Sequence, residues 1–420
     1  MKKIHLWMLV ASVGLFTTCQ SEDIEQEEKG KEETFVPMLF SEKIEKDNTF
    51  TFDLFRATYA NAKEENLFIS PLSVSLAFNM VLNGARGDTR TEILEALRCK
   101  GYSVEDVNEY SQSLGVNLVN AIGLSFADEM KFSIANSMWF HDNWGSYPVK
   151  KDFIEINKKY YDAEVNEIDF GASDALTRIN GWCAEKTNNK IKKVLDKVDP
   201  AALMYIINAV YFKGVWYYPF LDELTQPGQF YPETGKSMEA DMMTATGYYN
   251  YFEDNYCQYL ELPYKSPNFG MVLMLPREGK TTGDVIRSMD NDRWTMVEDT
   301  FASKNVYLQL PRFQFECRYE MQDDILPDMG MKKPFDPNEA DFKGIIDMSL
   351  YISRVIHNTF IEVNEKGTEV AATTVIEFPI GGSGIKPPKP IDYIVNKPFL
   401  FAIREKTTGA ILFIGKVGKI

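Results

Sequence analysis

The sequence predicts one large α+β domain, and three observations point to this class. The chain has 420 residues, of which 45% are hydrophobic and 13% aromatic, so it can bury a large core. Helical patterns gather in the first half, and long apolar strand patterns dominate the second half. There is no regular strand–helix alternation and no internal repeat. We therefore expect helices and strands to segregate around a single core.

The N-terminus is typical of an export signal. Two lysines precede an apolar run, Leu6 to Phe16, that is shorter than the ~20 residues a membrane-spanning helix needs. Small residues then lead to Cys19, which resembles a bacterial lipoprotein signal, although Thr18 stands where such signals carry Gly or Ala. We expect a signal peptide at 1–18 and a lipid on Cys19; an ordinary signal peptide cut nearby is the alternative. The protein would then be exported, to the outer membrane or cell surface of a bacterium, facing the extracellular space or periplasm.

The charge balance limits the partners. The formal net charge is −16, and a dense acidic run at 22–33 predicts a solvated tether over 19–40, ahead of a domain at 41–420. Polyanions need a basic surface, so we expect no nucleic-acid partner and membrane contact only through the lipid anchor. We expect a monomer.

Histidine is too scarce for most site chemistry. Only His141 and His357 lie outside the signal, and they lack ligand spacing, so we expect no metal and no cofactor. A catalytic triad would need one of them as its base. The stretch "GGSGI" lacks the last glycine of a GxSxG elbow, and the P-loop, HExxH and dinucleotide motifs are absent. An enzyme is therefore disfavoured.

Four cysteines remain beyond Cys19, widely spaced and without a CxxC pair: Cys99, Cys183, Cys257 and Cys317. An exported domain could join them in two disulfides. The chain is long enough not to need covalent staples, so we favour buried free thiols.

Helices come first along the chain. Ser70 is a candidate N-cap, Pro71 suits the first helical position, and Asn83-Gly84 is a stop signal. Further helices are predicted from residue 88 or 89, at 152–165 and at 174–191.

Strands follow. The run at 131–140 is apolar, and the run at 202–212 has almost no polar alternation, so it should lie mid-sheet with both faces covered. More strands are predicted at 259–264, at 270–276 and across 305–321. The C-terminal stretch 397–417 predicts a hairpin whose turn ends in Gly409.

The stretch from 368 to 378 also alternates as a strand. One face carries Thr368, Val370, Ala372, Thr374, Ile376 and Phe378; the other carries Glu369, Ala371, Thr373, Val375 and Glu377. The first face has no charge and can be buried while the second stays wet. A glycine-rich segment and a stiff "KPPKP" stem follow. A flexible tip between a latent strand and a rigid stem suits a protease bait loop; a plain surface strand before a disordered loop is the alternative.

Four long stretches, in order, resemble the serpin family of serine and cysteine protease inhibitors, over about residues 50–417. They are "NLFISPLSVSLAFNMVLNGARGDT", "INAVYFKGVW", "VIHNTFIEVNEKGTEVAATT" and "NKPFLFAIREKTTGAILFIGKV". The resemblance implies the serpin fold, with three β-sheets, eight or nine helices and an exposed reactive-centre loop at about 365–390. It also implies that a target protease attacks this loop and is trapped as a covalent acyl-enzyme when the freed loop inserts into sheet A.

The resemblance also assigns roles to residues. In the hinge, Glu365 matches the acidic base, Gly367 the flexing glycine and Thr368 the first residue to insert. The rest of the hinge is Glu369, Val370, Ala371 and Ala372, where Val370 departs from the usual alanine. Three roles fall outside the loop. Arg312 matches the partner of Glu365, and Trp216 matches the breach at the top of sheet A. The hydrogen-bonded shutter beneath sheet A is matched by Ser70, Ser73, Asn208 and His357.

The scissile bond follows from the family's spacing. Counting from Glu365 places it at Gly381-Gly382, whereas counting back from Pro398 gives a later position. Ile380 just before it would suit elastase-like or subtilisin-like serine proteases, and papain-like cysteine proteases are further candidates. Because no charge or proline blocks the buried face, we expect an inhibitor. A non-inhibitory serpin acting as a carrier, and a structural surface lipoprotein whose loop docks a partner, are the rivals.

Overall fold

The computed structural model describes residues 36–142, 147–368 and 389–420. Residues Phe40–Ile420 form one compact unit. None of the helices in the described ranges is long and apolar enough to cross a bilayer. Helix α1 begins at Val36, so the last residues of the segment expected as a tether are helical. The signal peptide and Cys19 lie outside the described residues.

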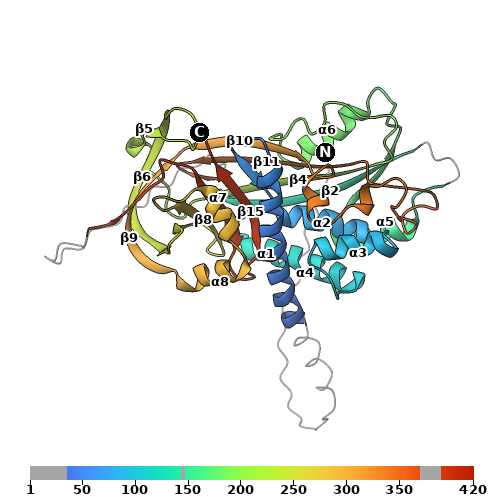
Figure 1. The fold of residues 1–420 in the computed structure, drawn as a ribbon, viewed down its shortest axis with the longest axis horizontal. Coiled ribbons are helices and arrows are strands. Elements are labelled where there is room, and N and C mark those ends of the chain that lie inside the picture. The colour runs from blue at the N-terminus through green and yellow to red at the C-terminus, as the bar shows by residue number, and fades with distance from the viewer. Residues whose placement is uncertain (1–35, 143–146, 369–388) are drawn as a thin grey trace, which may run out of the picture. The chain divides into compact units, whose positions relative to one another are not determined.

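Nine α-helices occur in the described ranges (Figure 1). They are α1 (Val36–Asn61), α2 (Pro71–Leu82), α3 (Gly87–Ala96), α4 (Val104–Ile122), α5 (Lys151–Tyr161), α6 (Ala175–Lys186), α7 (Thr282–Ser288), α8 (Asn291–Thr300) and α9 (Ile325–Asp328). Short 3-10 helices lie at Leu124–Phe126, Asp222–Leu224 and Lys333–Phe335.

The sequence predicts where the helices begin more accurately than where they end. Helix α2 has Ser70 as its N-cap and Asn83 as its C-cap, as predicted. Helix α5 ends at Tyr161, before the predicted 165, because Asp162 is left-handed with φ 48°. Helix α6 ends at Lys186, before the predicted 191, and the next turn holds two left-handed asparagines. Asn and Asp tolerate this conformation, and it ends a helix whatever the apolar pattern beyond it.

A six-stranded sheet contains the predicted hinge. Its strands are β2 (Met130–His141), β3 (Glu164–Ile168), β4 (Met204–Val215), β10 (Phe313–Glu320), β11 (Arg354–Asn364) and β12 (Gly367–Thr368), in the order β10-β11-β12-β4-β2-β3. Strand β4 pairs with β2 along one side and with β11 and β12 along the other. The prediction that the apolar run at 202–212 lies mid-sheet is therefore confirmed.

The remaining strands form a nine-stranded network. They are β1 (Leu67–Ile69), β5 (Gln226–Phe230), β6 (Met238–Glu253), β7 (Cys257–Pro263), β8 (Phe269–Pro276), β9 (Ala302–Pro311), β13 (Ile391–Ile394), β14 (Phe399–Glu405) and β15 (Ile411–Val417). The long strand β6 pairs with β5 and β9 over most of its length and with β7 at its end. Strand β6 therefore joins β5, β9 and β13 to β7, β8, β14, β15 and β1 in one hydrogen-bonded network, and the described strands form two sheets where the resemblance implied three. The C-terminal hairpin is present, with Gly409 at φ 80° in its turn.

The chain passes from one sheet to the other at Arg312. Strand β9 ends at Pro311 in the nine-stranded network, and β10 begins at Phe313 in the six-stranded sheet. The apolar stretch 305–321 therefore divides between two sheets. This break holds Arg312 at the edge where the hinge enters the six-stranded sheet.

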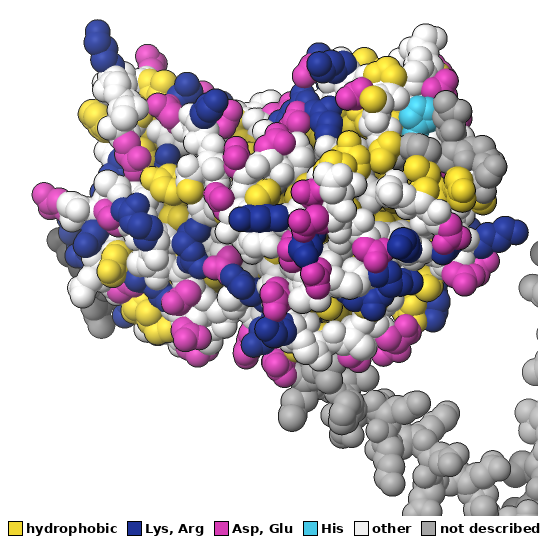
Figure 2. Space-filling model, turned by 45° about the vertical axis from the view of Figure 1, so that its right-hand side comes forward, with side chains coloured by type: hydrophobic (Ala, Val, Ile, Leu, Met, Phe, Trp, Pro, Cys, Tyr) yellow, Lys and Arg dark blue, Asp and Glu magenta, His cyan; other side chains and the backbone are white. Residues whose placement is uncertain are grey.

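Both faces of the six-stranded sheet are covered. Helix α2 lies on one face, within the main core, and α6 lies across the other (Figure 1). A second apolar cluster beneath α6 includes Trp139, Tyr205 and Ile356 from the sheet and Ile179 and Trp182 from the helix. On the surface shown in Figure 2, basic and acidic side chains are interspersed and form no continuous basic area.

Candidate functional site

The predicted hinge lies between two strands of the six-stranded sheet. Thr368 is opposite Val363 of β11 and also opposite Gly214 of β4, and Gly367 is opposite Asn364 and Val215. Farther along, β11 and β4 pair directly and in parallel, from Arg354–Tyr205 to Asn358–Ala209. The two strands therefore separate at one end of the sheet, and β12 occupies the opening.

Thr368 has its side chain on the buried face. It is 2% exposed, and its hydroxyl lies 2.8 Å from the hydroxyl of Tyr264. The Tyr264 ring stacks on Trp216, with ring centroids 4.7 Å apart, and burial raises the pKa of Tyr264 far above its usual value. The indole N–H of Trp216 donates to the carbonyl of Asn364 at 3.0 Å. Trp216 thus contacts both the turn at Asn364 and the tyrosine that holds Thr368.

Glycine is the only residue type that fits at position 367. Its φ is +155°, and a Cβ atom there would lie 2.1 Å from the carbonyl oxygen of Gly214 and 2.8 Å from Cα of Val215. Both neighbours are backbone atoms, so no side-chain rotation relieves the contact.

Glu365 is anchored by an ion pair at the base of the hinge. The carboxylate is buried, and Nε of Arg312 donates to its two oxygens at 2.7 and 2.8 Å. The hydroxyl of Thr225 also donates to it, and Asp241 and Asp222 lie 3.4 and 3.8 Å from the same guanidinium. Burial alone would raise the pKa of Glu365, but the hydrogen bonds from Arg312 and Thr225 outweigh it and hold the pKa below its usual value.

Ser70 and His357 form a buried polar cluster beneath the sheet. The backbone N–H of Ser70 donates to Nε2 of His357 at 3.0 Å, and the Ser70 hydroxyl donates to the carbonyl of Leu412 at 2.9 Å. Ser73 is also fully buried, and its backbone N–H donates to the hydroxyl oxygen of the N-cap residue Ser70 at 3.4 Å. Asn208 lies opposite His357 in the parallel β4–β11 pair. Burial lowers the pKa of His357 to about 3, so the imidazole is neutral.

Among the described residues, two polar side chains of β11 lack hydrogen-bond partners where β11 and β4 pair directly. Nε2 of His357 is an acceptor, so Nδ1 carries the proton, and this Nδ1–H has no hydrogen-bond partner within the described ranges. The amide of the next residue, Asn358, is fully buried on the opposite face, and neither its oxygen nor its nitrogen has a partner there. Unpaired buried polar groups each cost about 1–3 kcal/mol, so this part of the sheet is under-satisfied.

The rest of the predicted loop lies outside the described residues: Glu369, Val370, Ala371, Ala372, Ile380, Gly381 and Gly382. Four contact residues went unpredicted: Tyr264, Thr225, Asp222 and Asp241. Each comes from a distant part of the chain, and each is an ordinary polar or aromatic residue in its own segment, so no local pattern marks it.

The four described cysteines, Cys99, Cys183, Cys257 and Cys317, are buried free thiols. Burial raises their pKa values, to about 11 for Cys99 and Cys317 and about 12 for Cys183 and Cys257. A nucleophilic cysteine needs a lowered pKa and access, so none of these four thiols suits catalysis.

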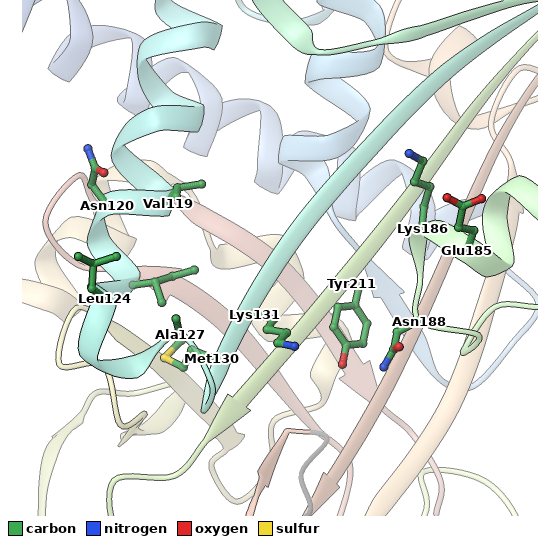
Figure 3. Close-up of a pocket in the computed structure, with 12 residues that line it drawn as sticks. Val119, Asn120, Leu124, Ala127, Met130, Lys131, Glu185, Lys186, Asn188 and Tyr211 are labelled. Atoms are coloured by element: carbon green, nitrogen blue, oxygen red, sulfur yellow. The ribbon is translucent and has the colours of Figure 1, made fainter. Parts of the chain in front are cut away.

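A pocket of about 560 Å³ lies away from the hinge, between the end of α4, strands β2 and β4, and the end of α6. Val119, Leu124 and Met130 line its α4 side, and Lys186 and Asn188 its α6 side (Figure 3). None of the hinge or shutter residues described above lines it. We therefore assign it no part in the action of the hinge.

Comparisons with known proteins agree with this arrangement. Residues 45–420 match the family model described as "Serpin (serine protease inhibitor)". A serpin-like protein of Methanosarcina acetivorans is 33% identical over 377 residues, which cover 88% of this chain and 86% of that protein. The leukocyte elastase inhibitor of Xenopus tropicalis is 33% identical over 378 residues, covering 87% of this chain and 96% of that protein.

A solved structure shows the same fold. The native state of the thermophilic serpin tengpin superposes with a TM-score of 0.82 at 31% identity, covering 90% of this chain and 94% of that one. The matched model, the relatives and the fold together show that the chain belongs to the serpin family.

Proposed function

We propose that this protein is a suicide inhibitor of elastase-like or subtilisin-like serine proteases, and also of papain-like cysteine proteases. The protease attacks the loop beyond Thr368 and forms an acyl-enzyme. The freed loop end then inserts between β11 and β4 and displaces the protease before deacylation. The observation that carries this proposal is the position of β12, whose two residues already lie between these strands in register with both.

The register supports insertion without any strand shift. Each further residue after Thr368 would pair one position earlier on β11 and one earlier on β4. Residue 373 would then lie opposite both Asn358 and Ala209, and residue 377 opposite both Arg354 and Tyr205. Those residues already face each other in the direct β4–β11 pair. The new strand would separate five existing parallel pairs and replace them with antiparallel pairs on both sides.

The same register brings hydroxyl groups to the unpaired polar groups of β11. Thr374 would lie opposite His357 on the buried face, where its hydroxyl can accept from Nδ1–H. Thr373 would lie opposite Asn358 on the other face and can pair with its amide. Insertion would therefore satisfy groups that the native sheet leaves without partners.

The energetics also favour insertion. The face that Thr368 begins continues with Val370, Ala372, Ile376 and Phe378. Burying these apolar side chains would stabilise the inserted form by about 5–10 kcal/mol. Each new ladder hydrogen bond adds about 1 kcal/mol at most. The native state is then held by a kinetic barrier and not by being the most stable arrangement.

A protease panel tests the proposal. The protein is mixed with pancreatic elastase, subtilisin, papain and trypsin, and SDS gels are read for a covalent complex. We expect stable complexes with the first three and a released C-terminal fragment that begins near Gly381-Gly382 by mass spectrometry. The 33% identity to an elastase inhibitor supports this target class. Clipping of the loop by every protease without a stable complex would contradict inhibition and favour a carrier.

We also propose that the protein acts as an exported monomer anchored through a lipid on Cys19. The N-terminal pattern supports this, and the acidic stretch behind it gives the domain reach from the membrane. Metabolic labelling with palmitate should label the wild type and not Cys19→Ser. Equal labelling, or label in neither protein, would contradict the anchor.

A further inference from the structure

We propose that the described chain holds a site for one divalent transition-metal ion, such as Zn²⁺, formed by His141, Asp142 and Asp169. One donor atom from each residue can be chosen so that all three lie within 4.8 Å of one another. Nδ1 of His141 lies 3.7 Å from an oxygen of Asp142, and Nε2 lies 4.0 Å from an oxygen of Asp169; a single ion would bind one of these two nitrogens. The inference is independent of the inhibitory function proposed above.

The topology explains why these residues meet. Strands β2 and β3 are parallel, and His141 at the end of β2 pairs with Ile168 at the end of β3. The residues that follow the two strands therefore emerge at the same edge of the sheet. No sequence spacing marks such a site, because the two aspartates follow different strands, with helix α5 between them in the chain. This is why the sequence predicts no metal.

Backbone hydrogen bonds hold the three ligand residues in place. The N–H of His141 donates to the carbonyl of Leu203 at 3.3 Å, and the N–H of Asp142 donates to the carbonyl of Ile168 at 3.0 Å. The N–H of Gly171 donates to the carboxylate of Asp169 at 2.7 Å. The Phe170 ring packs against the imidazole, with ring centroids 5.3 Å apart. These contacts hold the backbone of the three residues and the imidazole ring in place before any ion arrives.

The charges favour a cation. Neither Asp142 nor Asp169 forms an ion pair with a lysine or arginine among the described residues; the ion pairs of both are with His141. The His141 side chain is 11% exposed, whereas the aspartate side chains are 47% and 56% exposed, so an ion can enter from the carboxylate side. The carboxylates of Asp142 and Asp169 therefore lie beside the imidazole of His141, and no lysine or arginine of the described residues neutralises them.

The donor set indicates the class of ion. Imidazole nitrogen with carboxylate oxygen suits Zn²⁺, Co²⁺ or Mn²⁺, whereas Ca²⁺ and Mg²⁺ prefer oxygen alone. Tetrahedral ligands at about 2.0–2.1 Å from Zn²⁺ lie closer together than 4.0 Å. Small rotations of the exposed aspartate side chains bring the oxygens to that distance. Water completes the coordination.

Calorimetry with the bare ions tests the site. The purified, tag-free chain with Cys19→Ser, which removes the thiol outside the described ranges, is titrated with ZnCl₂ and, in parallel, with MgCl₂. We expect one Zn²⁺ per chain and no Mg²⁺ binding. Replacing His141 with Ala should weaken Zn²⁺ binding by more than about 10-fold, the loss that even residues outside a ligand set can cause.

Matched variants keep the test decisive if His141→Ala fails to fold. Asp142→Asn and Asp169→Asn preserve side-chain shape and should each weaken binding by a similar factor, whereas the exposed Asp299→Asn should not. Co²⁺ should give visible absorption bands that disappear in the two aspartate variants. No Zn²⁺ binding by the wild type, or equal affinity in all variants, would overturn the proposal.

Discussion

Replacing Thr368 with Arg tests the first step of insertion. The Thr368 side chain is 2% exposed and contacts the hydroxyl of the fully buried Tyr264. A guanidinium in this position would lose its water without gaining an anionic partner, and burying such an unpaired charge costs several kcal/mol. Because Thr368 already lies between β11 and β4, the charge should expel β12 from its place in the native state, and insertion must then bury the guanidinium again. A rise of about 3 kcal/mol in the insertion barrier slows that step by about 100-fold.

Slower insertion changes how the acyl-enzyme divides between trapping of the protease and deacylation. Deacylation proceeds at its usual rate while insertion is delayed, so we expect the number of inhibitor molecules consumed per protease to rise to the order of 100. Titration of residual elastase activity measures this number, and SDS gels should show clipped inhibitor in place of the complex. Thr368→Val is the matched control, because it removes the hydroxyl but adds no charge; its stoichiometry should change by less than about 10-fold. A covalent complex formed by Thr368→Arg at the wild-type stoichiometry would show that this face is not buried during inhibition.

Three further changes probe the hinge and the shutter. Gly367→Ala should raise the inhibition stoichiometry at least about tenfold in the same titration, because its Cβ would lie 2.1 Å from a backbone oxygen and force the hinge out of its slot; unchanged stoichiometry would contradict this. Arg312→Met should lower the stability of the native state by about 1–3 kcal/mol at neutral pH in urea unfolding. Because the ion pair lowers the pKa of Glu365, the difference in unfolding free energy between the wild type and this variant should shrink as the pH falls below about 4.3, through the folded pKa. A difference that does not depend on pH would contradict the ion pair. The folded pKa of His357, about 3, lies below the usual value of about 6.5, so the protein loses stability as the pH falls below 6.5. The free energy of unfolding should be lower by about 2 kcal/mol at pH 5. In His357→Gln this part of the pH dependence should be missing.

The hinge was the part of the site most accessible from sequence. Glu365, Gly367 and Thr368 lie together in the chain, and their turn and strand pattern is local. The family resemblance also pointed to Arg312 as the partner of Glu365, and the structure contains this ion pair. The groups that surround the pair were not predictable. Tyr264 reaches the hinge because the chain after β7 bridges to Trp216 after β4, and Asp241 because the start of β6 lies beside Arg312. Thr225 comes just before β5, which pairs with the start of β6, and no local pattern encodes these meetings.

The fold shows a similar division. Strand β4 and the C-terminal hairpin follow directly from apolar runs and turn residues. The split of 305–321 between two sheets at Arg312 does not, because both halves carry the same strand pattern and only tertiary packing separates them. Helix α4 also went unpredicted, although Ser103 and Asp106 form a capping box at its start. That signal is local and could have been found.

The unpaired groups on β11 could not have been read from sequence either. His357 and Asn358 look like ordinary strand residues, and only the β11–β12 register shows that Thr374 and Thr373 would lie opposite them in the proposed inserted strand. In that proposal each threonine would supply a partner to a buried group that lacks one among the described residues.

Thermal unfolding of the loop-cleaved protein tests strand insertion most directly. The loop is cut near Gly381 with a protease that the intact protein does not trap, the two fragments are kept together, and unfolding is followed by circular dichroism. Insertion worth about 5–10 kcal/mol should raise the melting temperature of the cut form by about 10–20 °C, at roughly 2 °C per kcal/mol for a large domain. A cut form that melts at the temperature of the intact protein would mean that β11 and β4 do not accept the strand.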